Sequence, residues 1–491
     1  MSTQKKLMTN WRWWMVVLLF LATTINYMDR QVLSLTWKDF IAPEFHWTDA
    51  DYGKITSVFS LVYAICMLFA GKIVDWLDTK KGYLWSIGIW STGAIMHALC
   101  GWATMHVQGF DSVAAMQAVE KGSAAALGIA STSVWLFIAA RCILAAGEAG
   151  NFPAAIKTTA EYFPKKDRAF ATSIFNSGAS IGALLAPATI PLLAQYFKNK
   201  GLGGGWEMAF VIIGALGYLW MALWVFMYDK PEKSKKVNAA ELEYIHQDDA
   251  EDQKLNAAQS SENVDKKIPL WKCFTFRQTW AFFLGKFFTD GVWWFFLFWA
   301  PAYFSDQFGY TSSSKMGVLL ITTLYAIVTV ISIFGGYLPR IFVDKKGMNP
   351  YQGRMLAMLL FAFFPIAALF AQPLGAHSAW WPAILIGLAG AGHQAWSANL
   401  FSTVGDMFPK SAVATITGIG GMAGGIGSAL IQYIAGALFT KTEALGSAFN
   451  FLGFEGKQGG YFVVFCCCGI AYLLAWCLMK VLVPKYKQVE I

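Results

Sequence analysis

The sequence predicts an all-α membrane protein with twelve transmembrane helices in two pseudo-symmetric six-helix bundles. Hydrophobic residues make up 56% of the 491 residues and charged residues only 14%, whereas soluble domains are about 25% charged. Apolar segments long enough to span a bilayer, which takes about 20 residues, recur along the whole chain. In addition, the two halves of the chain share a loop pattern, which is typical of membrane transporters built from repeats.

The apolar segments fall into two sets of six. The first set lies near 12–35, 52–74, 83–104, 131–153, 168–193 and 207–229. The second set lies near 278–304, 314–338, 355–372, 380–402, 412–438 and 461–483. The first segment reaches span length and no small-residue cleavage site follows it, so we expect it to be a span rather than a signal peptide.

The predicted domains are an N-terminal bundle over 1–229, a cytoplasmic linker over 230–275 and a C-terminal bundle over 276–491. The linker is polar and charged and lacks apolar periodicity, so it cannot be embedded in the membrane. Within it, "AAELEYIHQDDAEDQ" is a candidate amphipathic surface helix. Lys and Arg are enriched in the loops on the side of the termini, which predicts that both termini are cytoplasmic. Residues 105–130 would form an outer insertion without an assigned role.

The two halves repeat a loop pattern. "GKIVDWLDTKKG" follows the second span and "GYLPRIFVDKKG" follows the eighth, each with a glycine and two lysines at the same offsets. In the first copy these residues are Gly71, Lys80 and Lys81. Such duplication in membrane proteins usually encloses a midplane site that opens alternately to either side of the membrane. The pattern therefore favours a transporter over a pore or an enzyme.

Four ionisable residues lie within spans of the first half, namely Asp29, Arg30, Arg141 and Glu148. A charge inside the bilayer costs several kcal/mol and normally faces a cavity or a partner. Arg30 cannot lose its proton and offers a planar fork of donors, so we expect it to anchor the carboxylate of an organic anion. We expect Asp29 and Glu148 to exchange protons, with Arg141 holding Glu148 when Glu148 is ionised. The alternative is a set of structural salt bridges.

Polar residues also lie within spans of the second half. In the seventh span, Lys286 and Asp290 are four residues apart and should meet on one helix face, as a structural or a functional pair. Trp293, Trp294 and Trp299 follow, and an indole such as that of Trp294 can pack against a sugar ring or against other helices.

The tenth span contains "GAGHQAWSANL", a cluster of neutral hydrogen-bonding groups that suits the hydroxyls of a polar ligand. We take His393, Gln394 and Asn399 as candidate substrate-binding residues. Alternatively, His393 forms a structural hydrogen bond to a neighbouring helix.

Six segments carry a resemblance to a known family: "NYMDR", "RCILAAGEAGNFPAAIKTTAEYFPKKDRA", "DGVWWFFLFWAPAYF", "GGYLPRIF", "AGHQAWSANLFSTVGDMFP" and "SVFSLVYAICMLFAGKIVD". With these segments the sequence resembles the anion:cation symporter family of the major facilitator superfamily, and within it the bacterial hexuronate transporters. It covers nearly the whole chain outside the linker and the 105–130 insertion.

The resemblance implies a twelve-helix fold and proton-coupled uptake of sugar acids such as galacturonate or glucuronate across the bacterial inner membrane. It implies that Arg30 contacts the substrate carboxylate, that Asp29 and Glu148 couple protons, and that Tyr63 lines the substrate cavity. It also implies a gating motif, which is present as Gly71, Asp75, Lys80 and Lys81.

The chain departs from the family pattern at three positions. Trp76 replaces a usual basic residue of the gating motif, Asp78 replaces its usual glycine, and Ala179 stands where relatives often have Gln. The first two departures bear on the gating contacts, and the third bears on which hydroxyls of a substrate are recognised.

The sequence therefore predicts a proton-coupled symporter for a hexuronate that works by alternating access. The alternatives are a symporter for another organic anion, such as galactonate or glucarate, and a sodium-coupled transporter. We expect no cofactor and no metal, because no zinc-type Cys/His spacing accompanies the eight Cys and no oxygen cage for sodium is visible. No catalytic motif predicts an enzyme, and the dispersed Lys and Arg do not predict nucleic-acid binding. The chain contains both repeats, so a monomer should suffice.

Overall fold

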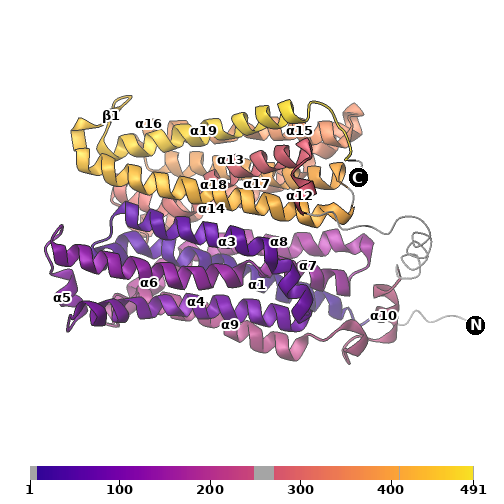
Figure 1. The fold of residues 1–491 in the computed structure, drawn as a ribbon, viewed down its shortest axis with the longest axis horizontal. Helices are drawn as coiled ribbons and strands as arrows, with labels where there is room; N and C mark the ends of the chain where they lie inside the picture. The colour runs from indigo at the N-terminus through magenta and orange to yellow at the C-terminus, as the bar shows by residue number, and fades with distance from the viewer. Residues whose placement is uncertain (1–7, 248–269, 409, 490–491) are drawn as a thin grey trace, which may run out of the picture.

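The computed structural model describes residues 8–247, 270–408 and 410–489, and Figure 1 shows them as two bundles of long, roughly parallel helices. The first half of the chain forms one bundle and the second half forms the other, each in its own layer. The first bundle contains α1 (Trp11–Thr36), the π-helical turn η1 (Trp37–Ile41), α2 (Ala42–Phe45), α3 (Asp49–Leu77), α4 (Thr79–Gln108), α5 (Val113–Gln117), α6 (Ala124–Glu148), α7 (Asn151–Tyr162), α8 (Lys165–Asn199) and α9 (Trp206–Met227).

The second bundle is also helical. It contains α13 (Arg277–Phe308), α14 (Lys315–Lys346), α15 (Pro350–Ala362), η3 (Phe364–Phe370), α16 (Ala371–Gly375), α17 (Trp380–Met407), α18 (Lys410–Leu445), η4 (Gly446–Ala448) and α19 (Gly456–Leu482). Between α18 and α19, the strands β1 (Asn450–Phe451) and β2 (Phe454–Glu455) form a small antiparallel hairpin in which Asn450 faces Glu455.

Within the described residues, nine helical segments are long and apolar enough to cross a membrane. Three further helices, α1, α4 and α17, have 26, 30 and 28 residues and lie alongside them. At a rise of about 1.5 Å per residue, each of these three is also of spanning length. The expected fold class, an all-α membrane protein of twelve spans in two bundles, is confirmed.

Two predicted spans are interrupted in the structure. The fourth consists of α6 and α7, which are separated at Ala149 and Gly150. The ninth begins as α15 and continues through the 3₁₀ segment η3, which carries Pro365 near its start. Proline lacks a backbone N–H and clashes with the preceding turn, which explains why regular α-helix ends there.

Most helix boundaries reach a few residues beyond the apolar segments, and polar residues cap some of the helix starts. At the start of α3, Thr48 and Asp51 form a capping box in which each side chain accepts a hydrogen bond from the other residue's backbone N–H. Ser123 and Ser314 cap α6 and α14 in the same way with a single bond. Such caps satisfy N–H groups that would otherwise lack partners at a helix start.

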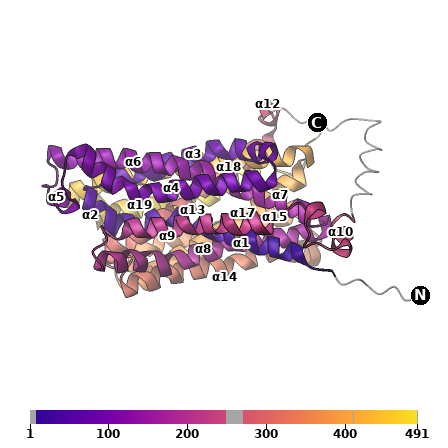
Figure 2. The same ribbon diagram turned by 90° about the horizontal axis from the view of Figure 1, so that it is seen from below.

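The two ends of the molecule differ. The start of α1 and the end of α19 lie toward one end, which we call the terminal end, while α2, α5 and the β-hairpin lie at the opposite end, which we call the distal end (Figures 1 and 2). The insertion 105–130 lies at the distal end and is partly helical, since α4 runs to Gln108 and α5 follows. His46 Nε2 contacts the carbonyl oxygen of Met116 at 2.9 Å, and this contact fixes α5 against the segment after α1.

The described part of the linker lies at the terminal end and contacts both bundles: Glu241 packs against the first bundle, and residues Leu270–Cys273 contact α18 of the second. It contains η2 (Pro231–Lys233), α10 (Ala239–Ile245) and α12 (Leu270–Cys273), and the rest of the candidate helix beyond Gln247 lies outside the described residues. Glu241 of α10 is buried and accepts hydrogen bonds from the backbone N–H groups of Trp11 (2.9 Å) and Arg12 (3.1 Å). It also pairs with the Arg12 guanidinium at 3.1 Å. A carboxylate at a helix start is stabilised by the helix dipole, so α10 caps α1.

Helices α3 and α18 form the closest contact between the two bundles. A Cβ atom added at Gly53 would lie 2.7 Å from the Gln432 carbonyl oxygen and 3.0 Å from Gly436 Cα. Near the middle of the two helices, Ser60 and Ser428 hydroxyls lie 3.0 Å apart. Small residues let helices approach closely where lipid supplies no hydrophobic drive.

The approach of α3 and α18 loosens toward the terminal end, where a Cβ at Gly71 would meet nothing within 4 Å. The bundles are therefore pressed together from the middle of the molecule to the distal end.

Candidate functional site

Arg30 and Glu148 form a buried ion pair between α1 and α6. Arg30 Nη2 lies 2.7 Å and Nε lies 2.9 Å from the same oxygen, Oε2 of Glu148. The exposed fraction of Arg30 is 3%, and the Glu148 side chain is fully buried. The second carboxylate oxygen, Oε1, has no hydrogen-bond partner among the described residues. Two donors of the Arg30 guanidinium thus bind one carboxylate oxygen. The guanidinium has further N–H donors, and Glu148 Oε1 can still accept a hydrogen bond.

Aromatic rings from both bundles surround the Arg30 guanidinium. Its central carbon lies 5.2 Å from the ring centre of Tyr27 on α1, 4.8 Å from Tyr63 on α3 and 4.7 Å from Trp294 on α13. Phe59 on α3 lies 5.8 Å away. Aromatic faces attract a cation at these distances. Because Trp294 belongs to the second bundle, Arg30 lies at the junction of the two bundles and not against lipid. We call Arg30, Glu148, Tyr63 and Trp294, with Tyr27 and Phe59, the central cluster.

The expected pairing of Arg141 with Glu148 is wrong in this structure, because Glu148 pairs with Arg30 instead. Seven residues of helix correspond to a rise of about 10.5 Å, so Arg141 and Glu148 share a face but lie two turns apart. Arg141 Nη2 instead donates to the backbone carbonyl oxygen of Arg30 at 3.3 Å, and its guanidinium carbon lies 5.1 Å from the Phe59 ring centre. Arg141 therefore holds the backbone that carries Arg30.

Asp29 is fully buried beside this cluster, and neither of its carboxylate oxygens makes a hydrogen bond within the described part of the chain. Glu148 and Arg141 both lie within its electrostatic reach. Two carboxylates and two guanidinium groups therefore share one buried region of the first bundle, and the total formal charge of the four ionised side chains is zero. A net-neutral set of this kind can take up a proton together with an anion without leaving a surplus charge in the bilayer.

The predicted i,i+4 pair of α13 is present: Lys286 Nζ lies 2.6 Å from Asp290 Oδ2. Both residues are buried, with exposed fractions of 4% and 9%. The Lys286 ammonium also lies 4.3 Å from the ring centre of Phe401 on α17. Asp290 Oδ1 has no hydrogen-bond partner among the described residues.

Two of the three candidates on α17, His393 and Asn399, bond to neighbouring helices of the second bundle. His393 Nδ1 lies 2.7 Å from the Tyr472 hydroxyl on α19, and its ring stacks on Trp293 with centres 5.5 Å apart. Asn399 donates to the carbonyl oxygens of Ala395 (2.8 Å) and of Gly335 on α14 (3.1 Å). Gln394 is half-buried. His393 and Asn399 therefore make helix-to-helix hydrogen bonds here, while Arg30, Tyr63 and Trp294 come together.

The gating motif lies at the terminal end. Asp75 pairs with Lys157 of α7 at 3.0 Å and Lys80 pairs with Asp229 at 2.8 Å, whereas Lys81 is exposed. These pairs connect segments of the first bundle only.

Asp78, where the family pattern has glycine, has φ +68° and ψ 156°, a conformation that favours glycine. Its carboxylate accepts a hydrogen bond from Thr79 N–H at 2.9 Å and pairs with Lys230 at 3.1 Å. The chain thus retains the backbone shape of the turn and holds it with side-chain contacts.

A ring of four charged residues joins the bundles at the distal end, and the sequence analysis did not identify it. Lys38 and Asp49 come from the first bundle, and Asp306 and Lys457 from the second. Lys38 contacts Asp49 at 3.3 Å and Asp306 at 2.8 Å, and Lys457 contacts Asp49 at 2.5 Å and Asp306 at 2.7 Å. Each cation therefore bridges both bundles. We call these four residues the distal ion-pair ring.

Asp39 of the first bundle also contacts the second bundle at the distal end. Its carboxylate accepts hydrogen bonds from Ser305 Oγ and from the Ser312 backbone N–H, both at 2.7 Å. No hydrogen bond or ion pair in the described residues joins the two bundles at the terminal end. Among the side chains that the structure describes, the polar contacts that join the bundles thus run from the middle of the molecule to the distal end.

Tyr27 and Phe59 were also missed as members of the central cluster. Tyr27 precedes Arg30 by three residues and Phe59 precedes Tyr63 by four, and both spacings place side chains on a shared helix face. Helical spacing from Arg30 and Tyr63 was thus a signal that could have identified both rings. The distal ion-pair ring had no such signal, because its contacts join Lys38 and Asp49 of the first half of the chain to Asp306 and Lys457 of the second.

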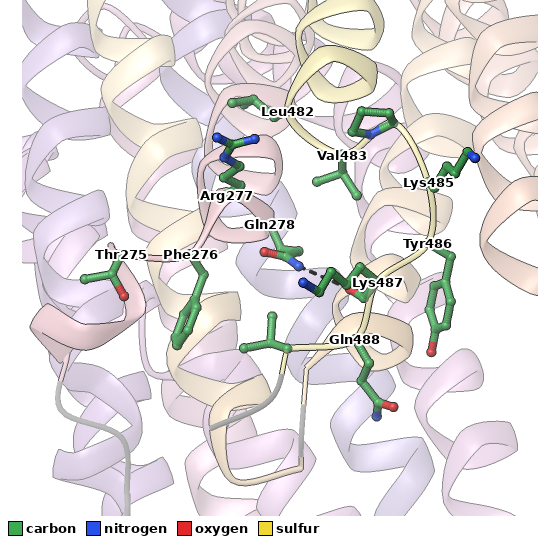
Figure 3. A pocket seen from close by; sticks show the side chains of 12 residues that line it. Thr275, Phe276, Arg277, Gln278, Leu482, Val483, Lys485, Tyr486, Lys487 and Gln488 are labelled. Carbon is green, nitrogen blue, oxygen red and sulfur yellow. Dashed lines mark hydrogen bonds between the residues drawn. The ribbon is translucent and has the colours of Figure 1, made fainter.

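A separate surface pocket of about 800 Å³ lies at the terminal end, between the start of α13 and the segment after α19 (Figure 3). Gln278 Nε2 donates to the Lys487 carbonyl oxygen at 3.2 Å across it. None of the central-cluster residues lines this pocket. Within the part of the chain that the structure describes, no group of three or more His, Cys, Asp or Glu side chains could hold a metal ion.

Comparison with known proteins gives related transporters. The chain is 28% identical to the hexuronate transporter of Escherichia coli (strain K12), covering 90% of this chain and 92% of that one. It is 28% identical to the galacturonate transporter of Dickeya chrysanthemi (72% and 89%). It is 25% identical to a probable galactarate/D-glucarate transporter of Escherichia coli (strain K12) (92% and 93%).

Two solved structures share the fold. A bacterial homolog of the human lysosomal transporter Spinster, in an inward-facing and occupied conformation, matches with a TM-score of 0.66 at 18% identity, covering 98% of this chain and 99% of that one. A D-xylose-proton symporter matches with a TM-score of 0.65 at 14% identity (96% and 99%).

The sequence model of the Major Facilitator Superfamily matches residues 19–432, which include the central cluster and extend from within α1 to within α18. The expected resemblance is confirmed, and so is the expectation of a transporter rather than an enzyme. The chain is a multi-pass membrane protein of the Major Facilitator Superfamily, a secondary transporter related to hexuronate, galacturonate and other sugar-acid transporters.

Proposed function

We propose that the protein is a proton-coupled symporter that imports a hexuronate, such as galacturonate or glucuronate, across the bacterial inner membrane. The observation that carries the proposal is the Arg30–Glu148 pair at the junction of the two bundles, enclosed by Tyr63 and Trp294. A guanidinium suits a carboxylate, and aromatic faces suit the C–H surface of a sugar ring. The relatives named for hexuronate and galacturonate support the choice of substrate.

Proton coupling follows from the competition for Arg30. Glu148 accepts two hydrogen bonds from the Arg30 guanidinium, and a substrate carboxylate must displace Glu148 to bind Arg30. Protonation of Glu148 removes its charge and releases Arg30, so that one proton and one anion enter together. Asp29, whose carboxylate has no hydrogen-bond partner among the described residues, is the second group that can exchange a proton. Arg141 acts as a positioning residue, because it holds the Arg30 backbone.

Alternating access is supported by the asymmetry between the two ends. The distal ion-pair ring and the close approach of α3 and α18 keep the distal end shut, and the described residues form no polar contact between the bundles at the terminal end. With both termini cytoplasmic, the distal end faces the periplasm and the structure is closed toward it. One chain supplies both bundles, so a monomer is the transport unit.

The decisive experiment is uptake of labelled galacturonate into proteoliposomes under an imposed pH gradient, with a sodium gradient tested separately. The proposal predicts accumulation with an acidic exterior and none with sodium alone. Sodium-driven uptake that ignores the pH gradient contradicts proton coupling. Uptake of galactonate or glucarate without galacturonate contradicts the hexuronate assignment and leaves the sugar-acid transporter intact.

A further inference from the structure

The Lys286–Asp290 pair is buried without being fully bonded. Lys286 contacts one carboxylate oxygen at 2.6 Å and one aromatic ring, although an ammonium has three donors. Asp290 Oδ1 is without a partner in the described part of the chain. A buried ion pair is favourable only when its remaining donors and acceptors are satisfied. The unbonded donors of Lys286 and the unbonded Oδ1 of Asp290 are therefore available to a polar ligand.

The pair lies on the helix face that reaches the central cluster. Lys286, Asp290 and Trp294 are spaced four residues apart on α13, so Asp290 lies about 6 Å along the axis from Trp294 and Lys286 about 12 Å. Trp294 contacts Arg30. Asp290 also acts electrostatically on Tyr27 of α1, which belongs to the same cluster. Along α13, Asp290 is therefore the first polar side chain beyond Trp294 in the direction of the helix start.

The backbone around Asp290 is built to hold it in place. A Cβ atom at Gly424 of α18 would lie 2.1 Å from Asp290 Oδ2, so only glycine permits the carboxylate to sit against this helix. On the other side, the Tyr472 hydroxyl donates to the Thr289 carbonyl oxygen at 3.1 Å, which fixes the turn of α13 before Asp290. Asp290 Oδ1 is the acceptor that these contacts leave unused.

We propose that Lys286 and Asp290 form hydrogen bonds with the hydroxyl groups at the end of the substrate opposite the carboxylate that Arg30 binds. We further propose that they select sugar acids with one carboxylate over dicarboxylates. A hydroxyl both donates and accepts, so it can donate to Asp290 Oδ1 and accept from the Lys286 ammonium. The pair carries no net charge, so it favours a neutral group. A second carboxylate at this end would face the open Asp290 oxygen and be repelled. This inference rests on the proposed function, in which Arg30 binds the first carboxylate.

The test compares binding of galacturonate and glucarate to the purified, detergent-solubilised protein by isothermal titration calorimetry. The wild type is expected to bind galacturonate at least about tenfold more tightly than glucarate. Asp290→Asn removes the repelling charge, so the ratio of the two affinities should shift toward glucarate by about tenfold. The matched control is Asp111→Asn, at an exposed carboxylate of the distal insertion, and the ratio should not change.

Because Asp290→Asn leaves Lys286 without its ionic partner, the double variant Lys286→Gln/Asp290→Asn is measured as well. It contains no lone buried charge, and it should bind both sugar acids weakly and without preference. Monodisperse elution in size-exclusion chromatography checks that each variant is folded.

An unchanged affinity ratio in both variants, with galacturonate still bound, overturns this inference and leaves the proposed function standing. Equal or tighter binding of glucarate by the wild type overturns it too. If the wild type binds no sugar acid, the proposed function and this inference both fail.

Discussion

Both contacting nitrogens of Arg30 donate to a single oxygen of Glu148, at 2.7 and 2.9 Å, while the other oxygen of Glu148 has no partner among the described residues. This geometry differs from the bidentate fork, in which each nitrogen meets its own oxygen and the pair is at its strongest. The contact is strong enough to hold Arg30 in the absence of substrate. It also leaves the guanidinium available to a competing carboxylate once Glu148 loses its charge.

Glu148→Gln is expected to separate binding from proton coupling. The amide cannot ionise, so Arg30 is permanently available and no proton is needed to release it. Accumulation of galacturonate driven by a pH gradient should be lost, whereas exchange of labelled for unlabelled galacturonate should persist. Glu120→Gln, at an exposed position, is the matched control and should retain both activities. Gradient-driven accumulation by Glu148→Gln at the wild-type level would refute the coupling role.

Arg30→Lys is expected to reduce galacturonate binding by about tenfold or more, because an ammonium cannot present the planar fork to a carboxylate. Binding is measured by titration calorimetry and uptake in proteoliposomes. Arg277→Lys, on an exposed residue at the start of α13, controls for the substitution itself and should bind as the wild type does. Wild-type affinity in Arg30→Lys would remove Arg30 from the substrate site.

Gly53→Val should block closure of the distal end. The added side chain meets backbone atoms of α18, the Gln432 carbonyl oxygen and Gly436 Cα, which cannot rotate away. Transport is therefore expected to stop, while galacturonate binding to the detergent-solubilised protein should remain. Gly405→Val is a suitable control, since a Cβ there meets nothing within 4 Å. Normal transport by Gly53→Val would mean that the close approach of α3 and α18 is not needed in the cycle.

A disulfide across the distal end should stop transport reversibly. The Ala50 backbone N–H donates to the Thr440 hydroxyl at 2.8 Å, so cysteines at these two positions lie across the interface between the bundles. Oxidation of the Ala50→Cys/Thr440→Cys variant should abolish uptake, and reduction should restore it. Each single variant treated in the same way provides the control. Undiminished uptake by a protein shown to be cross-linked would contradict opening at the distal end.

Glu44, in the short helix α2 at the distal end, should make stability depend on pH. Burial raises the pKa of Glu44 to about 8; the Trp206 indole, which donates to it at 2.9 Å, opposes the shift and Glu207 adds to it. An unfolded Glu titrates near about 4.3. Between these values the folded state binds more protons than the unfolded state, so stability is highest below the lower value and falls as pH rises toward 8.

The melting temperature of the solubilised wild type is therefore expected to fall between pH 5 and pH 8, and Glu44→Gln should flatten this fall. The exposed Glu120→Gln variant should keep the wild-type pH dependence. An identical pH dependence in Glu44→Gln and the wild type would show that Glu44 does not control it.

Much of the architecture was predictable from local pattern. Span-length apolar segments are recognisable because lipid contact demands apolar side chains over a fixed length, and the helices observed follow them. The boundaries were harder to predict, since caps such as Thr48 and Asp51 extend a helix beyond its apolar core. The break of the ninth span at Pro365 could have been predicted from the proline, because proline interrupts a regular α-helix.

The members of the site were only partly predictable. Arg30 and Glu148 were identified because a charged residue inside a span is energetically costly and is normally kept only where it has a partner or a functional role. Their partnership was not identified, since helical periodicity relates residues on one helix and says nothing about the neighbour across a helix interface. Arg141 was assigned to Glu148 for this reason, whereas the structure gives it the Arg30 carbonyl oxygen.

The sequence by itself determined that the chain is a duplicated helical membrane protein with charged groups inside its spans. Backbone N–H and C=O groups without hydrogen bonds, and charges without partners, are both energetically costly in lipid. The tertiary structure alone decided which charges meet. It placed Glu148 on Arg30 and Trp294 beside them, and it brought Lys38, Asp49, Asp306 and Lys457 into one ring. Most of those contacts join residues on different helices that are far apart in the sequence, and only the packing of the helices and of the two bundles sets their distances.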